Sequence, residues 1–104
     1  MIKRLEKGWL KVPCYYEEAG LLVTPSTTPM GEIVPNRFRI THAASGRTLG
    51  TVAFTTQEEA IRALRAIAPL TDWWQSFKTL RAKMNTDKQF SEKYFALMHS
   101  NYNE

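Results

Sequence analysis

The sequence lacks most of the residues that build metal and redox sites. Its 104 residues include one cysteine, Cys14, and two histidines, His42 and His99. One cysteine excludes an intramolecular disulfide, and a structural zinc site needs several thiolate or imidazole ligands at short spacing. We therefore expect a protein of a reducing compartment that holds no metal.

Long apolar runs and phosphate-binding glycine motifs are also missing. The longest apolar runs, such as residues 66–70, fall far short of the roughly 20 residues that cross a bilayer. The first residues carry Lys, Arg and Glu before any apolar run, unlike a secretory signal. The five glycines form neither a P-loop nor a dinucleotide fingerprint. The expectation is a cytoplasmic protein with no membrane contact and no small-molecule cofactor.

What is present suits one globular domain spanning residues 1–104. Apolar residues make up 43% of the chain and charged residues 23%, far from the composition of disordered proteins. Lys and Arg total 14 against 10 acids, so the net charge of +4 favours an anionic partner. The positive charge is spread along the chain with no basic tail, so a cationic surface must come from the fold.

The first part of the chain has the patterns of a hairpin and a loop. Residues 9–16 alternate in polarity, which predicts an edge strand with Cys14 on its buried face. Residues 17–20 supply a turn, and the apolar run 21–24 predicts a returning strand. Residues 25–36 contain three prolines among Gly, Ser and Thr, which predicts a long surface loop whose role the sequence leaves open.

A second hairpin is predicted over residues 37–54, with its turn at 44–47. Phe38 and Ile40 share one face with His42, which we expect to be a hydrogen-bonded histidine at the edge of the core. The alternate residues, Arg37, Arg39 and Thr41, are then expected to point outward.

Three helices are expected after this hairpin. Capping boxes at Thr55 or Thr56 predict the start of the first, which Pro69 ends. Thr71 or Asp72 is expected to cap the second and Thr86 the third. The expected apolar stripes are Trp73, Phe77, Leu80 and Met84 on the second helix, and Phe90, Tyr94, Leu97 and Met98, extended by Phe95 and Tyr102, on the third. The order predicts an α+β domain: an antiparallel sheet of three to five strands in the N-terminal half, followed by three α-helices packed on one face.

A search for catalytic groups indicates a protein that is not an enzyme. Cys14 and His42 can both lie in the sheet, where an imidazole activates a thiolate, but both residues fit the core better. The adjacent pair Glu17 and Glu18 is expected to be turn charge, and Glu58 and Glu59 are expected in the first turn of a helix, which favours acids.

Two binding surfaces are predicted instead. The first is the outward face of the second hairpin, with Arg37, Arg39 and Arg47, because guanidinium groups match phosphates and guanine edges. The second is a helical stripe of Trp74, Lys78 and Arg81, because an aromatic beside cations stacks on bases or anchors a protein interface. The alternative for each is ordinary structure: solvated sheet residues in the first case and a packed Trp74 in the second.

The span 36–64 resembles the sheet-then-helix unit of integrase arm-type and similar small DNA-binding domains. The resemblance lies in Arg37-Phe38-Arg39-Ile40, the Ser45-Gly46 turn, Val52-Ala53-Phe54 and Thr56-Gln57-Glu58-Glu59-Ala60. It implies a three-stranded sheet whose exposed face contacts DNA through Arg37, Arg39 and Arg47. The residues after Leu70 depart from that small fold.

The sequence thus favours a small cytoplasmic binding module that contacts nucleic acid, DNA first, through an Arg-bearing sheet face. The alternative is a protein-protein interaction module, such as an accessory or inhibitory factor of a mobile element. The identity of the partner, the choice between DNA, RNA and protein, and the oligomeric state stay open at this level.

Overall fold

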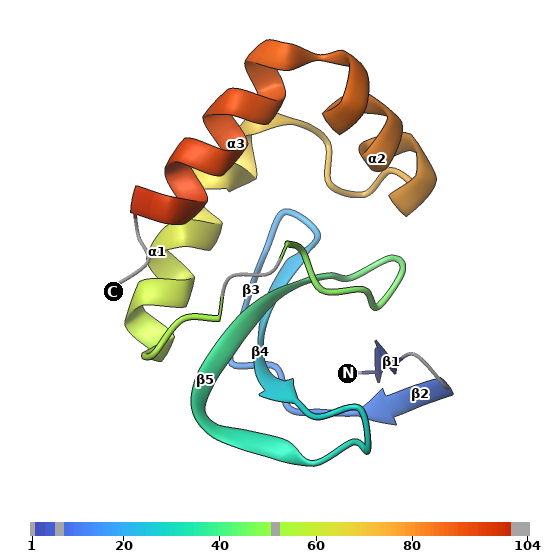
Figure 1. Cartoon of the computed structure of the whole chain (residues 1–104), viewed down its shortest axis with the longest axis vertical. Coiled ribbons are helices and arrows are strands. Elements are labelled where there is room, and N and C mark those ends of the chain that lie inside the picture. The colour runs from blue at the N-terminus through green and yellow to red at the C-terminus, as the bar shows by residue number, and fades with distance from the viewer. Residues whose placement is uncertain (1, 6–7, 51–52, 101–104) are drawn as a thin grey trace.

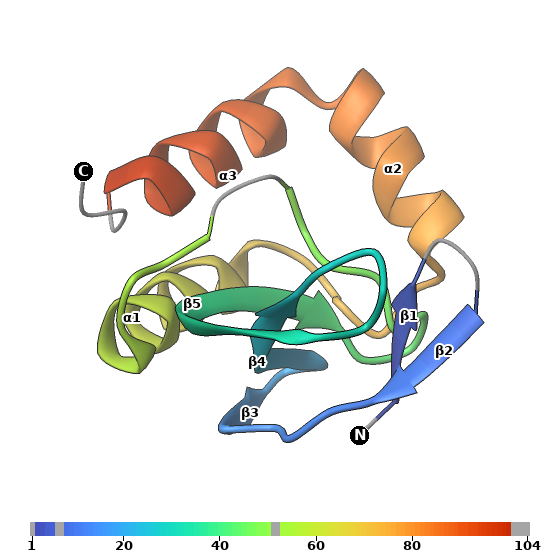
Figure 2. The same cartoon turned by 60° about the horizontal axis from the view of Figure 1, so that its bottom comes forward.

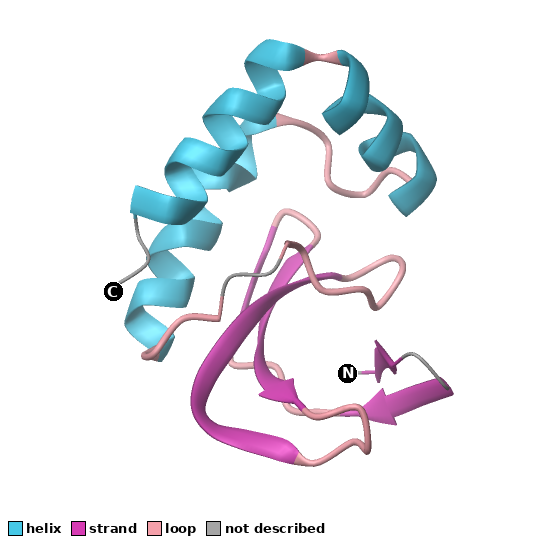
Figure 3. Cartoon of the chain, in the orientation of Figure 1, coloured by secondary structure: helices cyan, strands magenta, loops and turns pink. Residues whose placement is uncertain are grey.

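The computed structural model describes residues 2–5, 8–50 and 53–100. Two antiparallel sheets occupy the first half (Figure 1). The first is a two-stranded ribbon of β1 (Ile2–Leu5) and β2 (Gly8–Lys11). The second has the order β3-β4-β5, with β3 at Tyr16–Glu18, β4 at Leu21–Thr27 and β5 at Ile33–His42. Strands and helices are coloured by type in Figure 3.

Helices make up the second half of the chain. They are α1 (Gln57–Ile67), continued by the 3-10 turn η1 (Ala68–Leu70), α2 (Phe77–Thr86) and α3 (Lys88–Ser100). α1 packs directly against β4 and β5, and α3 packs against both α1 and α2 (Figure 2). The expected α+β arrangement, with strands followed by three helices, is confirmed.

The predicted strand over residues 9–16 is wrong. The chain leaves the ribbon at Lys11 and enters the three-stranded sheet only at Tyr16, so the alternation spans two different sheets. Pro13 lies in this connection, where its missing N–H costs no ladder bond. Cys14 is consequently exposed rather than buried, and its thiol lies 3.3 Å from the carbonyl oxygen of Tyr16.

The turn after β3 is shorter than the predicted turn over 17–20, because Glu17 and Glu18, expected to be turn charge, pair with Leu22 and Leu21 inside the sheet. Ala19 and Gly20 connect Glu18 to Leu21, and both have positive φ, at 56° and 87°. Two such residues in a row form the type of two-residue turn that matches the twist of a hairpin.

The predicted loop over 25–36 is also wrong, because β4 continues to Thr27 and β5 begins at Ile33. Pro25 pairs with Phe38 inside the sheet. This is tolerated because β3 pairs with β4 only as far as Val23, so Pro25 lies beyond the end of β3 and needs no donor on that side. The register shifts between Pro25 and Thr27, and the true loop is five residues long, from Thr28 to Glu32.

The second hairpin forms, but its return segment is irregular. Isolated bridges join Phe38 to Phe54 and Thr41 to Thr48, and the N–H of Leu49 donates to the carbonyl of Ile40 at 2.8 Å. Val52, predicted to be in this strand, lies outside the described residues.

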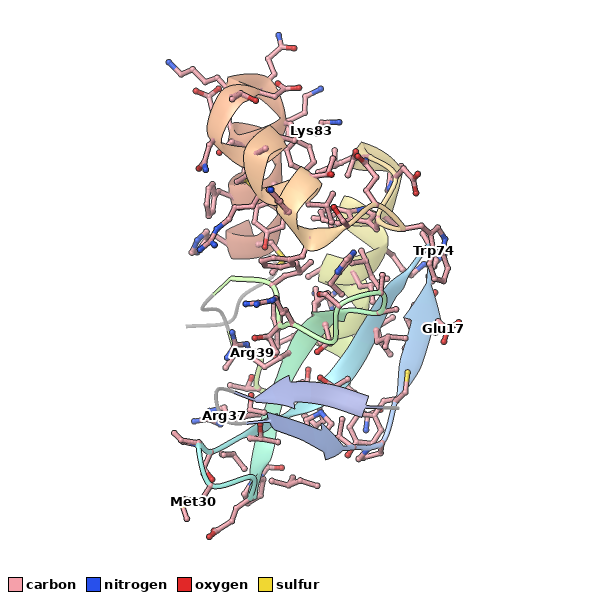
Figure 4. The ribbon with its side chains drawn as sticks, turned by 90° about the vertical axis from the view of Figure 1, so that its right-hand side faces the viewer. Glu17, Met30, Arg37, Arg39, Trp74 and Lys83 are labelled. Carbon is pink, nitrogen blue, oxygen red and sulfur yellow. The ribbon has the colours of Figure 1, made fainter. Side chains whose placement is uncertain are left out.

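The two faces of the β3-β4-β5 sheet are both covered. On one face Leu21, Val23 and Ile40 join the α1 side chains in the core. Figures 1 and 4 place the β1-β2 ribbon on the side of the sheet opposite α1. On this second face Thr41 is fully buried and its hydroxyl lies 2.8 Å from that of Thr24. The expectation that Thr41 points to solvent is wrong, because the ribbon was not recognised as a separate layer.

The helix starts were only partly predicted. Thr56 caps α1, since its hydroxyl accepts from the N–H of Glu59 at 3.1 Å, and Pro69 follows its end as expected. The second helix is capped by Ser76 rather than Thr71 or Asp72. The third is capped by Asp87 rather than Thr86, with Asp87 Oδ1 accepting from the N–H of Phe90 at 3.1 Å.

Among residues 2–5, 8–50 and 53–100, no helix is both long and apolar enough to cross a membrane.

Candidate binding groove

A groove of about 370 Å³ opens where α2, α3 and the segment at Leu49 and Gly50 meet. Its floor and walls are largely apolar, and its volume lies within the range of small ligand pockets. The lining residues are Leu49, Gly50, Trp73, Phe77, Leu80, Arg81, Met84, Asn85, Phe90, Tyr94 and Phe95. None of them is acidic.

Aromatic rings form the deep wall of the groove. Trp73 is buried, and its ring centroid lies 6.0 Å from that of Phe90 and 6.2 Å from that of Tyr94. Phe95 packs edge-on against Tyr94 at 5.2 Å and remains 48% exposed. The groove therefore combines a fixed aromatic floor with an aromatic ring that is open to solvent.

His42 anchors this floor to the sheet. Its Nε2 lies 2.7 Å from the carbonyl oxygen of Trp73, and its Nδ1 lies 2.7 Å from the hydroxyl of Ser45. A carbonyl can only accept, so Nε2 carries the proton and, in the neutral ring, Nδ1 accepts from Ser45. The expectation of a hydrogen-bonded histidine is confirmed, although His42 is fully buried rather than at the core edge.

A single residue sets the angle between the two helices of the groove. The N–H of Asp87 donates to the carbonyl of Lys83 at 2.8 Å, which ends α2. The carboxylate and carbonyl of the same residue accept from the N–H groups of Phe90 and Ser91, which begins α3. α2 and α3 thus meet with only Asp87 between them.

Three arginines reach the groove from three different segments. Arg39 of β5 donates a hydrogen bond to the carbonyl of Gly50, Arg47 lies 5.2 Å from the ring centroid of Phe77, and Arg81 lines the groove directly. The ion pairs found within the described ranges are Arg62–Glu58, Arg65–Glu18 and Lys88–Glu92. The groove arginines belong to none of these pairs, so no described carboxylate neutralises them.

Burial shifts the pKa of two groups here. Desolvation lowers the pKa of Arg39 from its usual value, an effect that the proximity of Tyr94 opposes. Burial raises the pKa of Tyr94 to about 12, with Arg39 acting in the opposite direction. A desolvated guanidinium is a group that gains from an incoming carboxylate.

The six predicted site residues separate into two groups. Arg39, Arg47 and Arg81 come together at the groove. Arg37 is exposed on β5 and donates to the carbonyl of Asn36 at 2.8 Å. Lys78 is exposed on α2, whereas Trp74 precedes that helix. The predicted helical stripe of Trp74, Lys78 and Arg81 is therefore wrong, because α2 begins at Phe77 rather than near Asp72.

Sequence reasoning missed the groove itself. Phe77, Leu80 and Met84 were predicted as core, yet Phe77 and Met84 are only partly buried. Phe95 was expected to extend the apolar face of α3 and instead stands at the rim. The signal that could have found the site is Arg81, a charged residue next to this apolar stripe.

Cys14 and His42, whose pairing as thiol and imidazole the sequence did not favour, are engaged with other groups. Both ring nitrogens of His42 bond to other groups, and the Cys14 thiol lies against the carbonyl oxygen of Tyr16. In the described part of the chain, no three His, Cys, Asp or Glu residues gather in a way that can hold a metal ion.

Comparisons with known proteins give no relative: no family model, curated protein or solved structure matches this chain.

Proposed function

We propose that this protein is a non-enzymatic cytoplasmic binding module whose groove takes an acidic, amphipathic segment of a protein partner. One observation carries the proposal: an apolar groove, open to solvent, is approached by three arginines, and none of the described residues that line it is acidic. Apolar side chains of the partner would fill the floor, and its acidic side chains would pair with the arginines.

The composition of the groove supports a peptide rather than a free anion. Leu49, Leu80 and Met84 supply aliphatic surface, which rewards burial of apolar side chains by about 25 cal/mol per Å². A helix laid into such a groove presents its anchors at spacings of three and four residues. Methionine in the wall adapts to side chains of different shape.

Nucleic acid is the second candidate, supported by the net charge of +4 and by the exposed Arg37. The DNA contact predicted from the sequence requires an exposed face on the second hairpin. Thr41, which was expected on that face, is buried. The aliphatic part of the groove is also a poor platform for stacked bases, which need aromatic or guanidinium surfaces. The DNA prediction therefore needs a different surface from the one first expected.

Designed probes can separate the two candidates. We would measure binding of a helical 14-residue peptide with Leu at anchor positions and Glu elsewhere, its Lys-for-Glu counterpart, and an oligothymidylate. The acidic peptide is expected to bind in the groove, and the Lys peptide is not expected to bind there. Arg81→Glu should weaken the acidic peptide about tenfold or more, because it replaces attraction with repulsion at the rim.

Arg62→Glu is the matched control, since Arg62 is exposed on α1 and contacts Glu58 rather than the groove. If Arg81→Glu and Arg62→Glu weaken the binding of the acidic peptide equally, only net charge matters, and binding in the groove is contradicted. Tight oligothymidylate binding that survives Arg81→Glu, with no binding of the acidic peptide, would support the nucleic-acid candidate instead.

A further inference from the structure

Trp74 lies flat on the turn between β3 and β4 and leaves its other side open. A Cβ placed on Gly20 would sit 3.1 Å from Cδ2 and 3.2 Å from Cε2 of Trp74, the two atoms shared by the indole rings. Only the face of the indole can bring both fusion atoms this close to the turn. With 60% of the residue exposed, the opposite face is available to a partner.

The loop that carries Trp74 is held in place before any partner arrives. The carboxylate of Asp72 accepts from the N–H of Trp74 at 2.9 Å, and the side-chain amide of Gln75 donates to the carbonyl of Asp72 at 2.9 Å. From α2, the ammonium of Lys83 donates to the hydroxyl of Thr71 at 2.9 Å. Little conformational entropy would remain to be lost when this surface binds.

Two acidic residues, Glu17 (Figure 4) and Asp72, lie on the flank of Trp74, whereas arginines approach the groove. Glu17 is exposed on β3, and Figure 4 shows it on the same flank as Trp74, with Arg37 and Arg39 on the other flank. Glu17 and Asp72 take part in none of the ion pairs of the described residues. The face of an indole carries negative electrostatic potential and attracts cations, arginine above all.

We propose that Trp74, with Glu17 and Asp72, forms a second binding surface that takes an arginine or lysine side chain from a basic segment of a protein partner. The guanidinium or ammonium lies on the open indole face, and the two carboxylates attract it. The two surfaces select opposite charges, so this proposal does not depend on the groove. A module with both can hold an acidic and a basic segment at once.

The test uses the full chain, labelled with ¹⁵N in its indole groups, and an arginine nonapeptide as the probe. Trp74→Ala identifies the Trp74 indole signal, which we expect to shift saturably as the peptide is added. Trp74→Ala should weaken binding roughly five- to tenfold, with Trp74→Phe in between because a smaller ring attracts a cation less. The double variant Glu17→Gln with Asp72→Asn removes charge but keeps the amide oxygen that can accept from Trp74, and should weaken binding several-fold.

Glu58→Gln is the control, because it removes an exposed acid on α1 away from this loop and should change nothing. A glutamate nonapeptide should leave the Trp74 signal in place. The proposal is overturned if the arginine peptide binds Trp74→Ala as well as the parent, or if Glu58→Gln weakens binding as much as the double variant. It is also overturned if an oligothymidylate, and not the arginine peptide, shifts the Trp74 signal, since the surface would then stack bases.

Discussion

The contact of α1 with the sheet and the contact between α2 and α3 are both apolar, but the first is closed and the second leaves a groove. Ala60, Ala63, Leu64 and Ile67 of α1 are all completely buried. α2 fully buries only Leu80 and leaves Phe77 and Met84 partly open at the groove. The closed contact uses small residues that let a helix lie close to strands, whereas the open one uses long side chains with space between them. Stability should therefore reside mainly beside α1, and binding beside α2 and α3.

The strongest test of this difference is Leu64→Ala. Leu64 has no exposed surface, so truncation should leave a cavity and cost about 3 to 5 kcal/mol of unfolding free energy. Phe95→Ala, at the rim of the groove, should cost less than about 1 kcal/mol. Urea unfolding of both variants measures this, and equal losses would show that the two regions are not distinct.

His42→Leu tests the connection between the regions. It removes the donor to the carbonyl of Trp73 and the acceptor for Ser45, and unpaired buried polar groups cost about 1 to 3 kcal/mol each. We expect a loss of about 2 to 3 kcal/mol, with amide exchange accelerated more in α2 and α3 than in α1. Ser45→Ala keeps the bond to Trp73 but removes the Ser45 hydroxyl that bonds His42 and accepts from the N–H of Arg47 at 3.2 Å, and should cost about 1 kcal/mol. A variant His42→Leu as stable as the parent would contradict the anchoring role.

Phe77→Ala tests whether the groove between α2 and α3 is open in solution. A fully buried phenylalanine costs about 3 to 5 kcal/mol on truncation, but Phe77 is partly exposed and should cost about 1 to 2 kcal/mol. Phe90→Ala, its buried counterpart across the groove, should cost the larger amount. Thermal melting of the pair decides the point, and the reverse order would mean that the groove is closed in solution.

Tyr94→Phe should change the response to alkaline pH. The pKa of Tyr94 is raised to about 12, so the native state favours the protonated hydroxyl. The stability that this preference gives the native state is complete below about pH 10, the pKa of tyrosine in the unfolded chain, and is lost as the pH rises through 12. By pH 11 the parent should lose about 1 kcal/mol that Tyr94→Phe does not lose. Denaturation curves at pH 9 and pH 11 give the free energy of unfolding at each pH. Tyr15→Phe, which removes the hydroxyl of an exposed tyrosine, is the control. If the parent and both variants lose the same free energy of unfolding between the two pH values, the raised pKa of Tyr94 is refuted.

Local signals predicted the parts of this fold that depend on neighbours in sequence. The cap at Thr56 and the stop at Pro69 each rest on a few adjacent residues, and the structure has both. The hairpin turn predicted at residues 17–20 also forms, but over Ala19 and Gly20 only. The α+β class followed from their order.

The wrong predictions concern features of the fold that depend on residues far apart in the sequence. Three prolines over 25–36 suggested a loop, but Pro25 is accepted because β3 stops short of it. Thr41 is buried by a separate layer, and Trp73 is buried without belonging to a helix. For the site, the arginines were chosen by residue type, and only three-dimensional packing shows that Arg39, Arg47 and Arg81 converge on one groove.

Because Asp87 alone joins α2 to α3, its φ and ψ angles set the angle between these two helices and so the width of the groove. The helices of a hairpin with a long loop can slide past one another. Here the end of α2 and the start of α3 are both hydrogen-bonded to Asp87. A guest that widens the groove would therefore have to rotate α2 and α3 about Asp87, because the direct junction leaves no loop in which the helices could slide. For a segment of a protein partner bound in the groove, thickness would then matter more than length.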